Sequence, residues 1–225
     1  MKLDSSFRFA VAAVDAVIFA IYDHELLVLV KSVSTEGGHY QNQFGFPGGV
    51  MRPDENAKQS LARHLKDKVG LADIYTEQLY TFTDVDRDVR SRAVAIAYLG
   101  LVSPEVAAQY VNGSAKFMPV SSIKTLAYDH LDMLAVARKR LASKLLYTTI
   151  ARVLLPTKFT LTELQLVYEI VRSETFDKRN FRKKILALDI IADSGEVQTG
   201  VANRPATLYS FTGTDVVDVP QIAGM

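Results

Sequence analysis

Apolar and polar positions alternate in blocks along the first half of the chain, and these blocks predict strands on either side of one helix. Two apolar runs, Ala10 to Tyr22 and Leu26 to Val30, are separated by a short polar turn and predict a β-hairpin of central strands. Segments dense in β-branched and aromatic residues predict further strands at Tyr75 to Thr83 and Ala93 to Val102, with a short late strand at Lys116 to Val120.

A helix is predicted between these groups of strands. Leu61, Leu65 and Val69 recur at the four-residue spacing of one buried helix face, within the amphipathic segment Glu55 to Leu71. The segment follows Gly45-Phe46-Pro47-Gly48-Gly49, where proline and paired glycines predict a tight turn. A strand, a glycine loop and a helix are therefore expected in this order.

A break between two domains is predicted near Pro156. A long apolar-periodic segment after Tyr128-Asp129-His130 predicts a helix, for which His130 is interpreted as a helix-start or core histidine. Proline disrupts a helix interior and favours extended geometry in the residue before it. We therefore expect one domain over residues 1–155 and a second over residues 156–225.

The second domain opens with signals for two helices. Thr160 and Glu163 have the spacing of a capping box, and apolar residues then repeat at helical intervals. Asp177 is a good N-cap for a second helix, in which Phe181, Ile185 and Leu188 predict a buried stripe. A basic, solvent-exposed face is expected on the other side of this helix.

This basic helix is a candidate for reading DNA, because recognition helices use their N-terminal residues in the major groove. Leu188 to Ala192 and Thr207 to Phe211 predict a β-hairpin wing, and the residues after Thr212 resemble a weakly ordered tail. Helix, basic helix and hairpin is the order of a winged helix-turn-helix. A basic helix can also be merely solvated, and small winged helices also bind proteins. The candidate DNA-binding residues are Lys178, Arg179, Asn180, Arg182, Lys183 and, in the wing, Arg204.

Composition narrows the setting of the protein. The 225 residues are 48% apolar, which is ample for a buried core, and the formal net charge is only +1, so attraction to nucleic acid has to come from local clustering. The chain has no cysteine, and its longest apolar run is interrupted by Asp15 and too short to span a bilayer. These features favour a cytoplasmic protein with no membrane partner.

The loop and helix around Gly49 resemble the Nudix box. The framework positions of that pattern are matched by Gly49, Glu55, Arg63, Leu65, Gly70 and Leu71. The family's metal-binding glutamates are not matched, because His64, Asp67 and Lys68 stand in their places. Mg²⁺ requires oxygen ligands, and the ammonium of Lys68 cannot coordinate it because it is positively charged and has no lone pair. The resemblance implies a Nudix fold that has lost hydrolysis and kept a binding pocket.

A charged stretch between the two later strands has two interpretations. One interpretation is a solvated loop, which is what charged stretches usually are. The other is a part of the pocket, because the loop with Asp86-Arg87-Asp88 resembles the one beside the effector site of Nudix-related regulators. Arginine forks suit phosphate groups. The candidate ligand-binding residues are Arg87, Arg90, Arg92, Lys68, Phe46, Gly48 and Gly49.

Both halves together resemble the Nudix-related transcriptional regulators, the NrtR family. The similar segments, beyond those already given, are Phe46 to Gly49, Phe159 to Leu161, Lys178 to Lys183 and Arg204 to Tyr209. The resemblance implies an α+β chain with a Nudix α/β/α sandwich followed by a winged helix. It also implies a homodimeric repressor of NAD-related or sugar-utilisation genes, with a palindromic operator in double-stranded DNA.

The resemblance implies ADP-ribose or a sugar as the effector, with no required cofactor. The alternative is a Nudix pyrophosphohydrolase that acts on ADP-ribose or a related nucleoside diphosphate derivative. That enzyme would have to assemble a Mg²⁺ site from Asp54, Glu55 and Asp67.

Overall fold

The computed structural model describes residues 9–33, 39–110, 114–199 and 205–220. Its residues form two compact units. The first comprises Met1–Phe19, Val28–Gly100 and Tyr110–Ala137, and the second Ala20–Leu27, Leu101–Gln109 and Arg138–Met225. The predicted domain limit at residue 155 stays a prediction.

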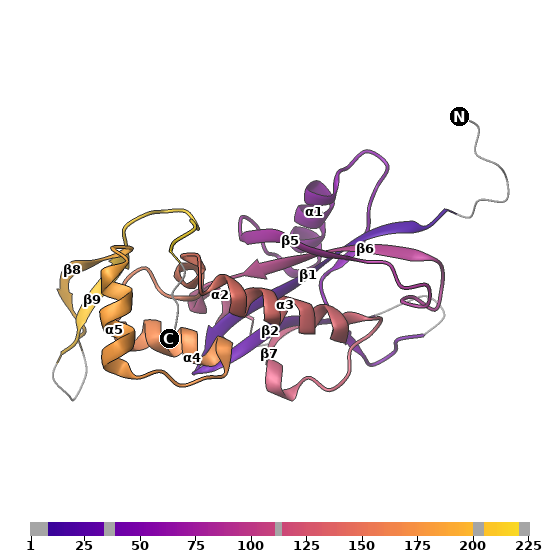
Figure 1. Ribbon diagram of the computed structural model, residues 1–225. Coiled ribbons are helices and arrows are strands. Elements are labelled where there is room, and N and C mark those ends of the chain that lie inside the picture. Colours follow the sequence, from indigo (N-terminus) through magenta and orange to yellow (C-terminus); the bar gives the residue numbers. More distant parts are fainter. Residues whose placement is uncertain (1–8, 34–38, 111–113, 200–204, 221–225) are drawn as a thin grey trace. The chain divides into compact units, whose positions relative to one another are not determined.

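A seven-stranded sheet is the centre of the first unit (Figure 1). Its main path runs β3-β2-β1-β6-β5, while β4 pairs with β1 and β7 pairs with β2. The strands are β1 (Val11–Tyr22), β2 (Glu25–Ser32), β3 (Phe44–Gly45), β4 (Gly48–Val50), β5 (Tyr75–Phe82), β6 (Ala93–Leu101) and β7 (Ala115–Pro119). All of the strands predicted for this half of the chain are confirmed.

The predicted β1–β2 hairpin has a tight turn at its end. Asp23 and His24 both have positive φ angles, 49° and 62°. Two such residues in succession match the twist of the strands that they connect, although asparagine and glycine are commoner in this role. The hairpin therefore forms without a glycine.

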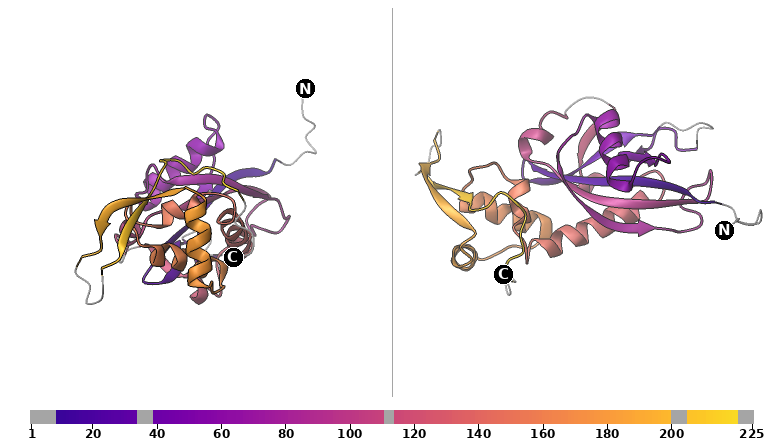
Figure 2. Two further views of the ribbon diagram at one scale, coloured as in Figure 1. Left: turned by 60° about the vertical axis from the view of Figure 1, so that its left-hand side comes forward. Right: turned by 90° about the horizontal axis from the view of Figure 1, so that it is seen from above.

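Two helices cover the sheet, with α1 (Ala57–Val69) on one face and α3 (His130–Lys144) on the other (Figures 1 and 2). Leu61, Leu65 and Val69 of α1 are buried, as their spacing predicted. Asn56 and Gln59 form a capping box at its start, and Gly70 ends it in the left-handed conformation at φ 67°. His130 opens α3 and is 2% exposed, which confirms its interpretation as a helix-start histidine of the core.

The second unit contains a winged helix. It consists of η2 (Ile150–Leu154), α4 (Leu161–Arg172), α5 (Lys178–Ala187) and the hairpin β8 (Ile191–Val197) and β9 (Thr207–Phe211), with the short α2 (Pro104–Ala107) also in this unit. The predicted capping box of Thr160 and Glu163 is present at the start of α4. Asp177 caps α5 by accepting a hydrogen bond from the Asn180 amide at 2.8 Å.

The first strand of the wing was predicted too early. Leu188 is the C-cap of α5, and Asp189 has a φ of 54°, so residues 188–190 make the turn out of the helix. The strand begins at Ile191 and continues to Val197, with an irregular register after Asp193. Residue 204, at the predicted tip, lies outside the described residues.

The prediction of a weakly ordered tail after Thr212 was wrong for residues 213–220. The Thr149 amide donates to the Val217 carbonyl at 2.9 Å, and the Val219 amide donates to the Tyr147 carbonyl at 2.7 Å. The Thr148–Asp218 bridge lies between these bonds. The tail is therefore paired with the segment between α3 and η2. This pairing joins residues 68 to 72 positions apart, which local composition does not encode.

Candidate functional site

A cavity of about 600 Å³ opens beside the glycine loop in the first unit. Its wall is formed by β1, β2, the loop of Phe46 to Gly49, the end of α1, the loop after β5 and the start of α3. This size lies within the range of small-molecule sites. Its charged lining residues are Asp15, Lys31, Lys68, Arg87, Asp88 and Arg90.

Gly48 allows the backbone to approach β1 closely at the floor of the cavity. It pairs with Asp15, and a Cβ at this position would lie 2.1 Å from the Val14 carbonyl oxygen and 2.3 Å from a carboxylate oxygen of Asp15. Neither neighbour can withdraw, because one is backbone in the central strand and the other is buried. This explains why the loop requires glycine here.

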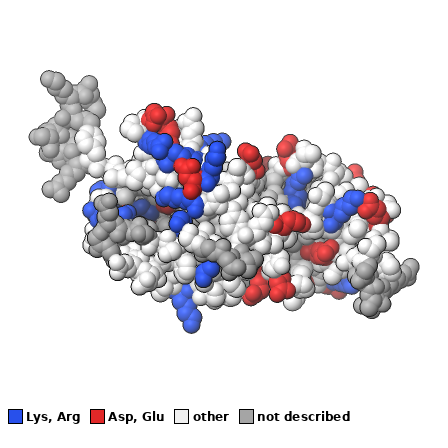
Figure 3. Space-filling model, turned by 180° about the vertical axis from the view of Figure 1, so that it is seen from behind, with Lys and Arg blue, Asp and Glu red and all other residues white. Residues whose placement is uncertain are grey.

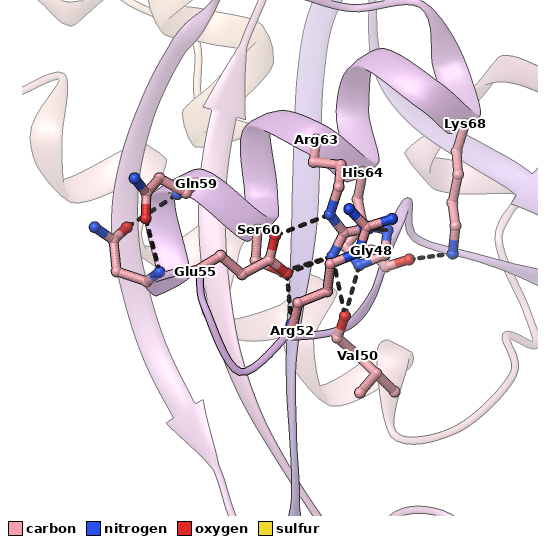
Figure 4. Close-up of polar contacts among 10 residues, drawn as sticks. Gly48, Val50, Arg52, Glu55, Gln59, Ser60, Arg63, His64 and Lys68 are labelled. Carbon is pink, nitrogen blue, oxygen red and sulfur yellow. Dashed lines mark hydrogen bonds and ion pairs between the residues drawn. The ribbon is translucent and has the colours of Figure 1, made fainter.

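The Nudix-box helix holds its charged residues in mutual contacts (Figure 4). Glu55 accepts hydrogen bonds from the Arg63 guanidinium and from the Arg52 amide. The bonds from Arg63, above all, hold the pKa of Glu55 well below its usual range. Glu55, one of the three carboxylates that the alternative pyrophosphohydrolase would need as metal ligands, is therefore already bonded to an arginine.

His64 and Lys68, which stand at two positions where the family pattern has metal-binding glutamates, also bond to the protein (Figure 4). His64 Nε2 lies 3.0 Å from the Val50 carbonyl oxygen, so this nitrogen carries the proton, and burial lowers the pKa of the ring. Lys68 donates to the Gly48 carbonyl. Within the described part of the chain, no three histidine, aspartate or glutamate side chains are grouped so as to hold a metal ion. The residues present do not fit the Mg²⁺ site of the Nudix pattern.

Two of the predicted arginines line the cavity, but each already has a carboxylate partner. Arg87 is buried and bonds both oxygens of Asp129, through Nε at 2.9 Å and Nη2 at 2.8 Å. Arg90 bonds Asp88 in the same bidentate manner and lies 5.3 Å from the centre of the Tyr128 ring. Their charges are largely balanced, which the sequence did not indicate.

Arg92 is not part of the cavity wall, contrary to its grouping with Arg87 and Arg90. Its guanidinium donates to the carbonyl oxygens of Asp84 and Ala93. It therefore secures the two ends of the loop instead of facing a ligand.

Of the cations that line the cavity, Lys31 and Lys68 form no ion pair with a carboxylate of the described residues. Both line the cavity, from β2 and from α1. Lys31 was missed at the sequence level, because it stands at the end of an apolar strand and belongs to no motif. The strand pairing in this sheet is what places it opposite α1.

Aromatic rings form the remaining wall. His130 stacks on Phe46 with ring centres 5.0 Å apart, and its Nδ1 accepts the Phe46 amide at 2.8 Å. Tyr128 contacts His130 and Tyr40, with ring centres 5.1 and 4.2 Å apart. A planar ligand group has an aromatic surface available here.

The second candidate site is the exposed face of α5. Lys178, Arg179, Asn180 and Lys183 are solvent-exposed, as predicted, while Phe181 and Ile185 are buried. Arg182 differs from its prediction, because it is half-buried, and its Nη2 lies 3.3 Å from the Thr162 hydroxyl of α4. Charges elsewhere are mixed, and basic and acidic side chains intersperse on the face shown in Figure 3.

The fold and its two sites define a class of protein, a Nudix domain followed by a DNA-binding winged helix. The family model of the NUDIX domain matches residues 11–139, and that of the NrtR DNA-binding winged helix domain matches residues 151–211. The chain belongs to the NrtR family of Nudix-related regulators. No helix in the described ranges is long and apolar enough to cross a membrane.

Two of the following relatives match along nearly the whole chain, and the third matches over 62% of it. The structure of Shewanella oneidensis NrtR complexed with a 27mer DNA is 32% identical with a TM-score of 0.78, over 89% of this chain and 93% of that one. The Nudix domain of that protein complexed with ADP ribose is 30% identical with a TM-score of 0.53, over 62% and 94%. The ADPR responsive transcriptional repressor NtrR of Acinetobacter baylyi is 29% identical, over 90% of this chain and 82% of the relative.

Proposed function

We propose that this protein is a transcriptional repressor that binds operator DNA through its winged helix and ADP-ribose through its Nudix cavity. One observation carries the proposal: the chain combines a cavity in which Lys68 stands at a metal-ligand position of the family pattern with a winged helix whose second helix is basic and exposed. The relatives with ADP-ribose and DNA in their names support it.

Lys31 and Lys68 are the proposed partners of the pyrophosphate, because both line the cavity and neither forms a direct ion pair with a carboxylate of the described residues. Tyr128 and Phe46 both line the cavity and both contact the His130 ring, and they are the proposed aromatic neighbours of the adenine ring. Lys68 neutralises the negative charge of the pyrophosphate, as Mg²⁺ does in the family pattern. We propose binding without hydrolysis, since the described residues contain no cluster of histidine, aspartate or glutamate side chains that fits a metal able to activate water.

DNA recognition is proposed for a homodimer. Two copies of α5 would meet successive major grooves about 34 Å apart or a multiple of that, so the operator is expected to be palindromic. ADP-ribose acts as effector only if it binds the free and DNA-bound proteins with different affinity.

Selection of bound sequences from a random DNA pool, followed by titration with ADP-ribose, tests this function. We expect an enriched palindrome whose affinity changes when ADP-ribose is added. Recovery of no motif at moderate salt would overturn the repressor assignment. An operator that is indifferent to bound ADP-ribose would overturn the coupling alone.

Lys68→Glu is expected to weaken ADP-ribose binding at least tenfold in EDTA, because a charged hydrogen bond is worth roughly 1.5–3 kcal/mol and is here replaced by repulsion. The wild-type protein is expected to bind equally well in EDTA and in Mg²⁺. Calorimetric titration measures both. Lys66→Glu is the matched control, since Lys66 is exposed on the same helix and does not line the cavity.

Hydrolysis is the contrary result. ADP-ribose turnover by the wild-type protein in Mg²⁺ or Mn²⁺, abolished by Asp67→Ala, would favour the pyrophosphohydrolase. So would a wild-type affinity that disappears in EDTA.

A further inference from the structure

Asp15 is an acidic residue within the apolar central strand β1. It is 8% exposed, and the strand residues on either side, Val14 and Ala16, are fully buried. Its side chain is in the wall of the cavity. An ionised carboxylate in such a place is costly unless it is paired or hydrogen-bonded.

Among the described residues, the Asp15 carboxylate has two long ion-pair contacts and accepts no hydrogen bond. Arg87 Nη2 is 3.9 Å from one of its oxygens and His130 Nε2 is 3.8 Å from the other, both beyond hydrogen-bonding distance. Arg87 is already held bidentately by Asp129. A purely structural role as counter-ion of Arg87 is therefore filled by another residue.

The carboxylate oxygens of Asp15 accept no hydrogen bond from the described residues, and this determines which kind of ligand group can bind beside them. An anionic group would be repelled by the carboxylate, and a cationic one would face Arg87 and Lys68. A neutral hydroxyl suits both sides, because it donates to the carboxylate and accepts from a neighbouring donor. A sugar offers two adjacent hydroxyls to the two carboxylate oxygens.

We propose that Asp15 accepts hydrogen bonds from a sugar diol of the ligand and thereby selects phosphate compounds that carry a ribose over simple phosphate anions. The proposal deepens the ADP-ribose function and rests on it. In this arrangement the lysines bind the anion and Asp15 reads the sugar beside it.

The test compares ADP-ribose with inorganic pyrophosphate, which has the anion and no hydroxyl. At about pH 8, above the raised pKa of Asp15, Asp15→Ala is expected to weaken ADP-ribose binding about 10- to 100-fold, the usual range for a hydrogen bond to a charged group. Pyrophosphate is expected to bind the variant as well as or better than the wild type, because a negative charge has gone. Adding ADP to the series shows which ribose Asp15 reads: an equal loss indicates the adenosine ribose.

Asp15→Asn guards against a folding artefact, since it keeps the shape and one acceptor oxygen, and should show an intermediate loss. Unchanged ADP-ribose affinity in Asp15→Ala, or equal losses for ADP-ribose and pyrophosphate, would overturn the proposal. If the wild-type protein binds free ribose but no phosphate compound, the ADP-ribose function fails, and the Asp15 dependence of ribose binding decides this inference. Binding of none of these ligands would overturn both.

Discussion

Asp15→Asn is expected to make the protein lose stability in acid, whereas the wild type keeps nearly constant stability between about pH 4 and 6.5. Burial raises the pKa of Asp15 to about 7. Burial, together with the positive charge of Arg87, lowers the pKa of His130 to about 3. In the folded protein at pH 5, Asp15 therefore holds a proton and His130 does not. In the unfolded chain the reverse holds.

The two residues act on stability with opposite signs. A raised folded pKa at Asp15 stabilises the protein below about pH 4, and this contribution is lost as pH rises to about 7. A lowered folded pKa at His130 stabilises it above about pH 6.5, and this contribution is lost as pH falls toward 3. Their slopes cancel where the windows overlap.

Removing either residue exposes the slope of the other. Asp15→Asn is expected to lose about 3 kcal/mol of unfolding free energy between pH 6.5 and 4, and His130→Asn to lose a similar amount as pH rises from 4 to 7. Urea-unfolding midpoints at half-unit pH steps measure this, with hydrogen exchange of β1 amides assigning the transition to the sheet. Parallel pH curves in all three proteins would contradict the assignment.

Replacing Arg179 and Lys183 together by alanine is expected to lower operator affinity by roughly one to two orders of magnitude. Each lost phosphate contact reduces the slope of log affinity against log salt by about one, so the pair should reduce it by about two. Both side chains are exposed on α5, away from buried Phe181 and Ile185, so folding should be unaffected. Fluorescence anisotropy at several salt concentrations measures affinity and slope together.

Arg138→Ala with Lys139→Ala is the matched control, because these exposed residues of α3 remove the same charge away from α5. An equal loss of affinity in the control would show that overall charge, and not the α5 face, drives DNA binding. Arg182 is left out of the pair because its contact with Thr162 mixes packing with DNA binding.

Local patterns predicted most of the fold. The capping box at Thr160 and the N-cap at Asp177 are made by residues three positions apart, so a short stretch contains all the information. The buried face of α1 follows from the helical period, and so does that of α5 at Phe181 and Ile185, whereas Leu188 of the predicted stripe is the half-buried C-cap. Such features are set by neighbours in sequence, which is where sequence reasoning is strongest.

The site depended on partners distant in sequence. Arg87 is neutralised by Asp129, 42 positions away, and Lys68 bonds the carbonyl of Gly48, 20 positions away. The motif located the cavity correctly, but a list of basic residues does not show which charges are already balanced. Lys31 and Asp15 have no motif at all and were found only from the strand pairing and the cavity wall.

The pairing of the tail with residues 147–149 brings the two ends of the winged-helix segment together. The start of this segment, at residues 147–149, is hydrogen-bonded to its end, at residues 217–219, so the two ends lie side by side. Domains with adjacent ends tolerate circular permutation and insertion into other chains. The winged-helix segment is therefore expected to tolerate a circular permutation in which a short linker joins its two paired ends.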